Sequence, residues 1–290
     1  MSADNPPVRS PAHGRLLVCP TPIGNLDDVT LRVLDALRDA DVVACEDTRH
    51  TRILLDRHGI DAARLVSLHE HNEHARAREL TARMRAGEMV AMVSDAGTPL
   101  VSDPGYALVQ ECIQEGLPIE VLPGPSAAVV ALVASGLPVD RWRFVGFLPR
   151  KRAELERLLV GDEETTVAYE SPRRLGATLV VLAGLDPERP VAVCRELTKL
   201  HEEVRRGSAS ELAEHYAQSP PRGEIVLVIG AAGSGPAGSG PTHLRHEEAI
   251  EAVRELVRAG AKPRRAARVV AKLTGVGTNE LYRELARGEQ

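Results

Sequence analysis

The chain has 290 residues, enough for two domains and a small appendage. Its hydrophobic share of 43% and charged share of 27% are ordinary for a soluble globular protein, and its net charge of −5 excludes a polycation that coats nucleic acid. No apolar run approaches the roughly 18 residues that span a bilayer, and no apolar stretch near the N-terminus suggests a secretory signal. We therefore expect a cytoplasmic protein whose residues 1–14, polar and rich in proline, form a disordered tail.

In the first half, short β-branched runs alternate with longer amphipathic stretches. The runs predict strands at 16–20, 41–46, 65–70, 89–95 and 119–123. The stretches predict helices at 28–38, 73–85 and 106–115. This alternation predicts an α/β domain over 15–136, with a largely parallel sheet covered on both faces. Its ligand is expected beyond the carboxyl ends of the strands.

A second α/β domain is predicted over 137–230. Its expected strands lie at 143–147, 165–170, 190–196, 202–206 and 224–229, with helices at 153–159, 173–183 and 211–217. Residues 231–243 have the composition of a flexible linker. Gly233, Gly235 and Gly238 match a dinucleotide-binding pattern, but no helix can open before about residue 244, so we reject that interpretation. Residues 244–290 predict three short helices around a glycine turn, similar to a helix-turn-helix.

Four turns rich in glycine and proline follow or precede predicted strands, at 20–28, 94–105, 122–127 and 223–226. Any one of them could be an ordinary turn. Together, however, they place flexible backbone where a ligand of an α/β sheet would bind. Asp95 or Asp103 could accept hydrogen bonds from ribose hydroxyls or a primary amine.

These turns resemble the tetrapyrrole methylases, a class of S-adenosylmethionine enzymes. The resemblance rests on Pro-Ile-Gly-Asn-Leu at 22–26, Asp-Ala-Gly-Thr-Pro at 95–99 with Ser-Asp-Pro-Gly at 102–105, and Leu-Pro-Gly-Pro-Ser at 122–126. Three further motifs, at 46–49, 169–174 and 195–199, are similar to the ribosomal small-subunit cytidine 2′-O-methyltransferases. The resemblance covers about residues 16–229.

The resemblance implies two α/β domains with S-adenosylmethionine in the cleft between them, commonly in a homodimer. It also implies a small-subunit (16S) ribosomal RNA substrate, either free or in the 30S subunit. Carried over by position, the residues expected at the cofactor are Pro22, Gly24, Asn25, Asp95, Gly97, Thr98, Pro99, Asp103, Gly124, Ser126, Ala127, Ala168, Tyr169, Gly223 and Glu224.

Methylation of a ribose hydroxyl needs a general base or a cation that stabilises the forming alkoxide. The candidates in these motifs are Glu46, Asp47, Glu170 and Lys199. Lys199 is the first choice, acting through its charge or, with a depressed pKa, as the base. Each could equally be a surface residue or part of an ordinary ion pair.

Local basic segments could contact RNA despite the net negative charge. In a strand, Trp142 and Phe144 would share one face while Arg141 and Arg143 share the other, which fits either a core strand with a solvated edge or a phosphate-binding rim. The C-terminal helices could equally serve packing or dimerisation. The basic residues considered for RNA contact are Arg49, Arg141, Arg143, Arg150, Lys151, Arg173, Arg174, Arg264, Arg265 and Arg268.

We expect neither a metal nor a disulfide. His69, His71 and His74 cluster without the His-Glu-x-x-His spacing of a zinc site. The four cysteines form no CxxC pair, which favours reduced buried thiols, although two disulfides are an alternative. The preferred function is 2′-O-methylation of a cytidine in small-subunit ribosomal RNA. The alternatives are a tetrapyrrole C-methyltransferase and a non-catalytic RNA-binding assembly factor.

Overall fold

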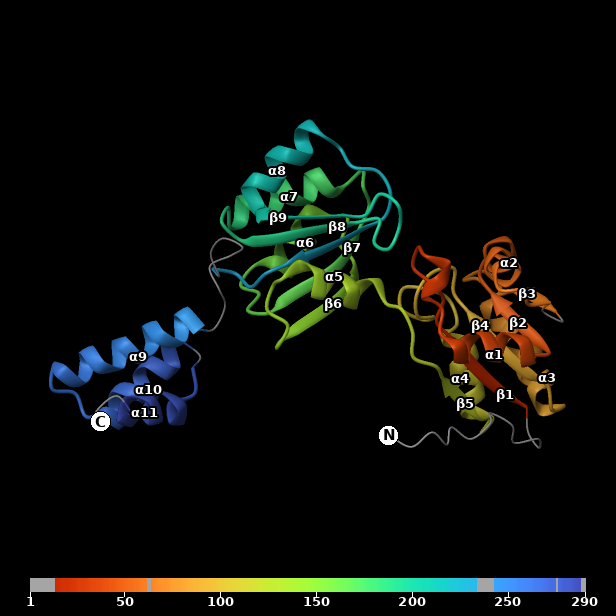
Figure 1. Cartoon of the computed structure of the whole chain (residues 1–290), viewed down its shortest axis with the longest axis horizontal. Coiled ribbons are helices and arrows are strands. Elements are labelled where there is room, and N and C mark those ends of the chain that lie inside the picture. Colours follow the sequence, from red (N-terminus) through yellow and green to blue (C-terminus); the bar gives the residue numbers. More distant parts are fainter. Residues whose placement is uncertain (1–13, 62–63, 234–242, 275, 288–290) are drawn as a thin grey trace.

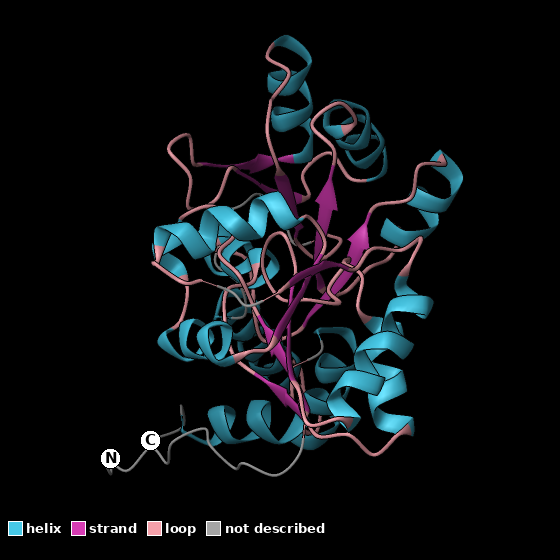
Figure 2. Cartoon of the chain, turned by 90° about the vertical axis from the view of Figure 1, so that its right-hand side faces the viewer, coloured by secondary structure: helices cyan, strands magenta, loops and turns pink. Residues whose placement is uncertain are grey.

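The computed structural model describes residues 14–61, 64–233, 243–274 and 276–287. It contains two five-stranded sheets followed by a group of three helices, which confirms the expected α/β class (Figure 1). Strands run through the interior and helices surround them (Figure 2). The expected disordered tail, apart from Gly14, and most of the expected linker lie outside the described residues.

The first sheet is entirely parallel and has the order β3-β2-β4-β1-β5. All its carboxyl ends therefore meet at one edge, and the loops that resemble the methylases gather there. Its strands are β1 Arg15–Cys19, β2 Val42–Cys45, β3 Leu65–Ser67, β4 Met89–Val93 and β5 Ile119–Val121.

Helices cover both faces of this sheet, as the alternating pattern predicts. On one face α1 (Leu31–Asp39) and α2 (Thr48–Arg57) pack leucine and valine side chains on β1, β2 and β4. On the other face α3 (Glu73–Arg85) and α4 (Tyr106–Gln114) do the same. The sequence analysis did not predict α2, which begins where the Asp47 side chain accepts a hydrogen bond from the Arg49 amide.

The second sheet is mixed, with the order β6-β7-β10-β8-β9. Only β6 and β7 are parallel, and the other neighbours are antiparallel. Its strands are β6 Trp142–Phe147, β7 Thr165–Glu170, β8 Pro190–Arg195, β9 Glu203–Ser208 and β10 Ile225–Ile229. Helices α6 (Arg152–Leu159), α7 (Leu175–Leu185) and α8 (Ala209–Gln218) cover one face.

The opposite face of the second sheet is covered by α5 (Ala127–Ser135), which the sequence analysis did not predict. The helix directly follows the loop after β5 but packs on β7, β8 and β10. Ile23, from the loop after β1, joins the same apolar cluster. The loop after β1 and the helix after β5 therefore both pack into the core of the second sheet. This packing brings the loops of the first sheet next to those of the second.

The three expected C-terminal helices are α9 (His243–Arg258), α10 (Pro263–Thr274) and α11 (Thr278–Arg287). They enclose an apolar cluster of their own around Val253, Ala267 and Leu281. Among the residues described, no helix is both long enough and apolar enough to cross a membrane. The four cysteines are buried and free.

Candidate active site

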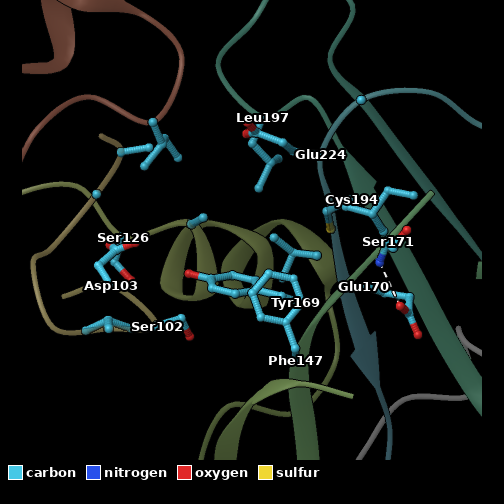
Figure 3. A pocket seen from close by; sticks show the side chains of 18 of the residues that line it. Ser102, Asp103, Ser126, Phe147, Tyr169, Glu170, Ser171, Cys194, Leu197 and Glu224 are labelled. Carbon is cyan, nitrogen blue, oxygen red and sulfur yellow. Dashed lines mark hydrogen bonds between the residues drawn. The ribbon is translucent and has the colours of Figure 1, made fainter. Parts of the chain in front are cut away.

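A cavity of about 350 Å³ opens where loops of the first sheet meet the second sheet. Figure 3 shows Ser102, Asp103 and Ser126 on one side of it and Leu197 and Glu224 on another. Its lining residues are Ile23, Ala96, Gly97, Thr98, Val101, Ser102, Asp103, Ser126, Ala127, Phe147, Tyr169, Glu170, Ser171, Pro172, Cys194, Leu197, Gly223, Glu224, Ile225 and Val226.

Three loops of the first sheet are tied together at this cavity. Thr21 and Gly97 exchange two backbone hydrogen bonds of 2.9 and 3.0 Å, which join the loops after β1 and β4. The Thr98 hydroxyl donates to the Pro125 carbonyl at 3.1 Å and so adds the loop after β5. Gly97 has φ +80°, a conformation that favours glycine. These ties fix the backbone that faces a ligand.

The first sheet's loops also dock directly on the second sheet's turn after β8. A Cβ on Gly24 would lie 2.5 Å from Lys199 Cγ, so only glycine allows this approach. The Asn25 amide donates to the Thr198 hydroxyl at 3.1 Å. Glu196 and Thr198 have φ of +50° and +65°, and such strained backbone is typical of functional sites.

Asp103 is the carboxylate of the first sheet that faces the cavity. Burial, together with the nearby carboxylates of Glu46 and Asp95, raises the pKa of Asp103 to about 7. The Tyr169 side chain points across the cavity toward Asp103 and Ser126 (Figure 3). Burial is the main cause that raises the pKa of Tyr169, which therefore stays protonated at neutral pH. A protonated phenol and a carboxyl group near neutrality thus share one cavity.

Aromatic side chains form another wall. The Tyr169 ring meets the rings of Phe144 and Phe147 edge to face, with centroids 5.0 and 5.4 Å away. Phe147 is 63% exposed, an unusual position for phenylalanine unless something covers it. Trp142 is 37% exposed. The register of β6 shifts between Phe144 and Phe147, and the exposed Phe147 ring lies at the cavity.

Eight of the fifteen expected cofactor residues line this cavity, and seven do not. Asp95 instead accepts a hydrogen bond from the Asp47 amide at 3.0 Å and lies 3.5 Å from His50 Nδ1. The lining eight are Gly97, Thr98, Asp103, Ser126, Ala127, Tyr169, Gly223 and Glu224. The other seven are Pro22, Gly24, Asn25, Asp95, Pro99, Gly124 and Ala168.

Of the four catalytic candidates, only Glu170 is among the lining residues. Its carboxylate is buried and accepts hydrogen bonds from the Thr178 hydroxyl at 2.6 Å and the Ser171 amide at 2.6 Å, the latter drawn in Figure 3. Asp47 caps α2 and pairs with Arg49, whose hydrogen bonds lower the pKa of Asp47 to about 2. Burial and then Asp95 raise the pKa of Glu46, which lies outside the cavity lining.

The structure corrects one expectation for Lys199. Its ammonium lies 3.0 Å from Glu196 Oε1 and 2.9 Å from Glu224 Oε2. Burial opposes the charged form, but the hydrogen bonds that the ammonium donates to these two carboxylates outweigh it and raise the pKa of Lys199. Of the two roles expected for Lys199, the one that needs a depressed pKa is therefore wrong, because two carboxylates hold the ammonium in its charged form. A role through its positive charge stays a prediction. Lys199 lies outside the cavity lining and forms an ion pair with Glu224, which is a lining residue.

The basic residues considered for RNA contact fall into two groups. Several contact other residues of the protein. Arg143 donates a hydrogen bond to Asp162 at 2.7 Å and Arg174 donates one to the Leu148 carbonyl at 2.9 Å. Ion pairs with nearby carboxylates are formed by Arg49, Arg141 and Lys151. Arg264 lies 5.4 Å from the centroid of the Tyr282 ring. Arg49, Arg141 and Lys151 are exposed despite these contacts, and the other exposed residues are Arg150 and Arg173 near the second sheet and Arg264, Arg265 and Arg268 on α10.

Several lining residues were missed by sequence reasoning, above all Ile23, Val101, Phe147, Cys194 and Leu197. They are apolar, and an apolar residue in a turn or a strand carries no functional group that marks it as part of a binding site. Phe147 could have been found, because the only phenylalanines and the only tryptophan lie within six residues of one another. No group of three or more metal-binding side chains occurs among the described residues.

Comparison with known proteins identifies the family. The sequence model of the Tetrapyrrole (Corrin/Porphyrin) Methylases matches residues 15–213. The chain belongs to this family. The resemblance of the three loops is thereby confirmed, and all but one of the cavity-lining loops and strand ends lie within the matched range. The exception is the segment that carries Gly223 and Glu224.

Curated relatives are similar over nearly their whole length. A protein of Mesorhizobium japonicum named ribosomal RNA small subunit methyltransferase I is 45% identical, over 95% of this chain and 92% of its own. A protein of the same name from Escherichia coli O157:H7 is 40% identical, over 97% of this chain and 96% of its own. This confirms the similarity to the small-subunit methyltransferases among the tetrapyrrole methylases.

Solved structures share the two-domain fold. A uroporphyrin-III-C-methyltransferase from Thermus thermophilus is 26% identical with a TM-score of 0.55, covering 75% of this chain and 94% of that one. A uroporphyrin-III C-methyltransferase structure from the same organism, complexed with S-adenyl homocysteine, is 22% identical with a TM-score of 0.52, covering 75% and 97%. Each match therefore covers about three quarters of the present chain and nearly all of the solved one.

Proposed function

We propose that this methylase transfers a methyl group from S-adenosylmethionine to the 2′-hydroxyl of a cytidine ribose in small-subunit (16S) ribosomal RNA. The observation that carries the proposal is full-length similarity of 40–45% to proteins named for methylation of small-subunit ribosomal RNA. The cavity supports it, since each of the three loops that resemble the methylases, and the motifs at 169–174 and 195–199, contribute residues to its lining.

The cavity fits the proposed cofactor. S-adenosylmethionine carries a sulfonium cation, an amine and an adenosine, so its site needs carboxylates beside apolar walls. Asp103 and Glu224 supply the carboxylates, while Ile23, Leu197 and Val226 supply apolar surface. The glycines at 97 and 223 have positive φ and leave backbone groups open to a ligand. Bound there, the cofactor would supply a methyl group already activated for displacement.

The protein's main task in such a reaction is positioning. Holding acceptor oxygen and methyl carbon in line can remove about 7–11 kcal/mol from the barrier. We assign the 2′-hydroxyl proton to the Asp103 carboxylate, because a base whose pKa lies near the working pH is the most effective. The Tyr169 hydroxyl, across the cavity, is placed to orient the acceptor (Figure 3).

The finer features of the proposal concern partners and location. An acceptor in the 30S subunit or in free ribosomal RNA, a homodimer and a cytoplasmic location all accord with a ribosomal RNA substrate. The exposed arginines of α10 support contact with RNA phosphates, and the three-helix unit carries them on a separate apolar core.

The test uses purified protein, tritiated S-adenosylmethionine and small subunits from a strain that lacks this gene. We expect label in the ribosomal RNA that survives alkaline hydrolysis within a dinucleotide, which is diagnostic of a 2′-O-methyl group. Cofactor binding without transfer to subunits or RNA would instead favour methylation of a tetrapyrrole. Failure to bind the cofactor would favour a non-catalytic assembly factor.

A further inference from the structure

A second cavity, of about 340 Å³, lies on the α8 side of the second sheet. It is lined by the side chains of β8, β9 and α8 and by the turn that leads into β10. We call it the basic cavity and define it by Arg195, Glu203, Arg205, His215, Tyr216 and Arg222. Three arginines and one glutamate give it a formal charge of +2 with His215 neutral, although the whole chain is acidic.

Two of the three arginines are held in place before any ligand arrives. Arg195 Nε lies 3.1 Å from Glu203 Oε2, and Arg205 Nη2 lies 3.1 Å from Glu203 Oε1. Burial opposes ionisation of Glu203, but hydrogen bonds from both arginines outweigh it and lower the pKa of this carboxyl. One carboxylate thus orients two guanidinium groups, each of which has several N–H donors and keeps some for a ligand.

The Tyr216 hydroxyl is an unpaired donor in this cavity. Tyr216 is 4% exposed, and the Arg205 guanidinium lies beside its hydroxyl oxygen, but no acceptor for the hydroxyl proton occurs among the described residues. A buried hydroxyl without a partner is costly, so it indicates a missing acceptor. Burial raises the pKa of Tyr216, and the phenol therefore keeps its proton for donation. An anionic oxygen would satisfy the hydroxyl and the arginines together.

The basic cavity lies directly behind the candidate active site. On β8, Cys194 lines the first cavity and Arg195 lines the basic cavity, because successive side chains of a strand face opposite ways. At the turn before β10, Arg222 lines the basic cavity and Gly223 and Glu224 line the first. The two cavities therefore lie on opposite faces of the second sheet and share the end of β8 and the turn before β10 as their boundary.

We propose that the basic cavity binds a phosphate group of the RNA backbone where the substrate strand passes around this edge of the second sheet, away from the methylated nucleotide itself. This inference rests on the proposed function. Arginine donors that share a single carboxylate suit a phosphodiester, and an RNA strand presents one phosphate per nucleotide. The contact positions the strand and carries no sequence information.

Two substitutions test the proposal with little risk to folding. Tyr216→Phe removes only the hydroxyl, and Arg222→Ala removes an exposed side chain for which the described structure shows no ion pair. Arg85→Ala, which removes the exposed arginine that ends α3 and pairs with Glu115, changes the charge by the same amount far from the basic cavity and is the control for charge. The measurements are binding of a short RNA with the target sequence as salt is varied, the KM for subunits, and binding of S-adenosylmethionine.

We expect each test variant to bind the RNA about tenfold more weakly and to raise the KM for subunits, with cofactor affinity unchanged. Arg222→Ala should also lower the slope of log affinity against log salt by about one, and Arg85→Ala should not. Thermal stability of Tyr216→Phe should equal or exceed that of the unaltered protein, since an unpaired buried hydroxyl is lost.

Unchanged RNA affinity and salt slope in both variants would overturn the proposal, while methylation by the unaltered protein would leave the proposed function standing. Titration with inorganic phosphate separates the source of the anion. Binding of phosphate that Tyr216→Phe abolishes, without any effect on RNA, would assign the cavity to a free anion and overturn the RNA assignment. If the unaltered protein methylates no RNA, the oligonucleotide arm still tests the phosphate contact.

Discussion

The Lys199 ammonium lies 2.9 Å from the Glu224 carboxylate and joins the turn after β8 to the turn before β10. It also contacts Glu196, whose pKa is lowered chiefly by a hydrogen bond from the Glu224 amide. These contacts set the position of the Glu224 side chain on the wall of the candidate active site. Lys199 acts on the cavity through Glu224.

Lys199→Ala should therefore weaken cofactor binding more than it slows chemistry. We expect the KM for S-adenosylmethionine to rise about tenfold, since a fixed ion pair at a binding wall is lost. Lys199→Arg, which keeps the charge, should restore much of the affinity. Steady-state kinetics against cofactor concentration check this. Normal turnover and a normal KM in Lys199→Ala would remove the residue from the site.

Asp103→Asn should abolish most of the methyl transfer if Asp103 accepts the proton. Loss of a general base typically costs a factor of about 10² to 10⁴ in rate. In the unaltered protein kcat/KM should fall as pH drops below about 7, where Asp103 of the ligand-free protein gains a proton. Asp35→Asn, on the exposed face of α1, is the control. A variant with normal kcat and the same pH profile would show that another group takes the proton.

The raised pKa of Asp103 also predicts how stability depends on pH. The folded protein keeps the Asp103 proton up to about pH 7, whereas the unfolded chain loses it near 3.8, so stability from this group is full below pH 3.8 and falls until pH 7. Asp103→Asn cannot ionise. Relative to the unaltered protein, the variant should therefore gain about 1–2 kcal/mol of unfolding free energy between pH 4.5 and pH 8, allowing for solvent screening. Urea unfolding of both proteins at both pH values measures this gain. A difference in unfolding free energy that does not change with pH would contradict the raised pKa of Asp103.

Glu170→Ala should reveal a structural role. Its buried carboxylate accepts hydrogen bonds from Ser171, Arg174 and Thr178. Removal of the carboxylate deprives all three donors of this acceptor. We expect a loss of about 3 kcal/mol in unfolding free energy. Well below its melting temperature the variant should still transfer methyl groups. Unaltered stability with lost turnover would instead make Glu170 a catalytic residue.

Local pattern was enough to predict most elements of this protein. The helix at 73–85 and the strand at 165–170 have the predicted bounds, because the period of apolar residues is a property of the segment itself. The sequence Ala-Ala-Val-Val-Ala-Leu-Val-Ala-Ser of α5 has no such period, since both the helix and a buried strand would be apolar all round. In the structure the segment is a helix that packs against the second sheet.

The sequence by itself determined the family and the loops that carry its motifs. Only the tertiary structure decided which residues of those loops face the cavity. Asp95 and Asp103 are the same residue type in one loop, yet Asp103 faces the cavity and Asp95 binds the Asp47 amide. The same holds for Lys199, whose pKa is set by carboxylates 3 and 25 positions along the chain. Burial and charge act through space, and sequence separation does not report either one.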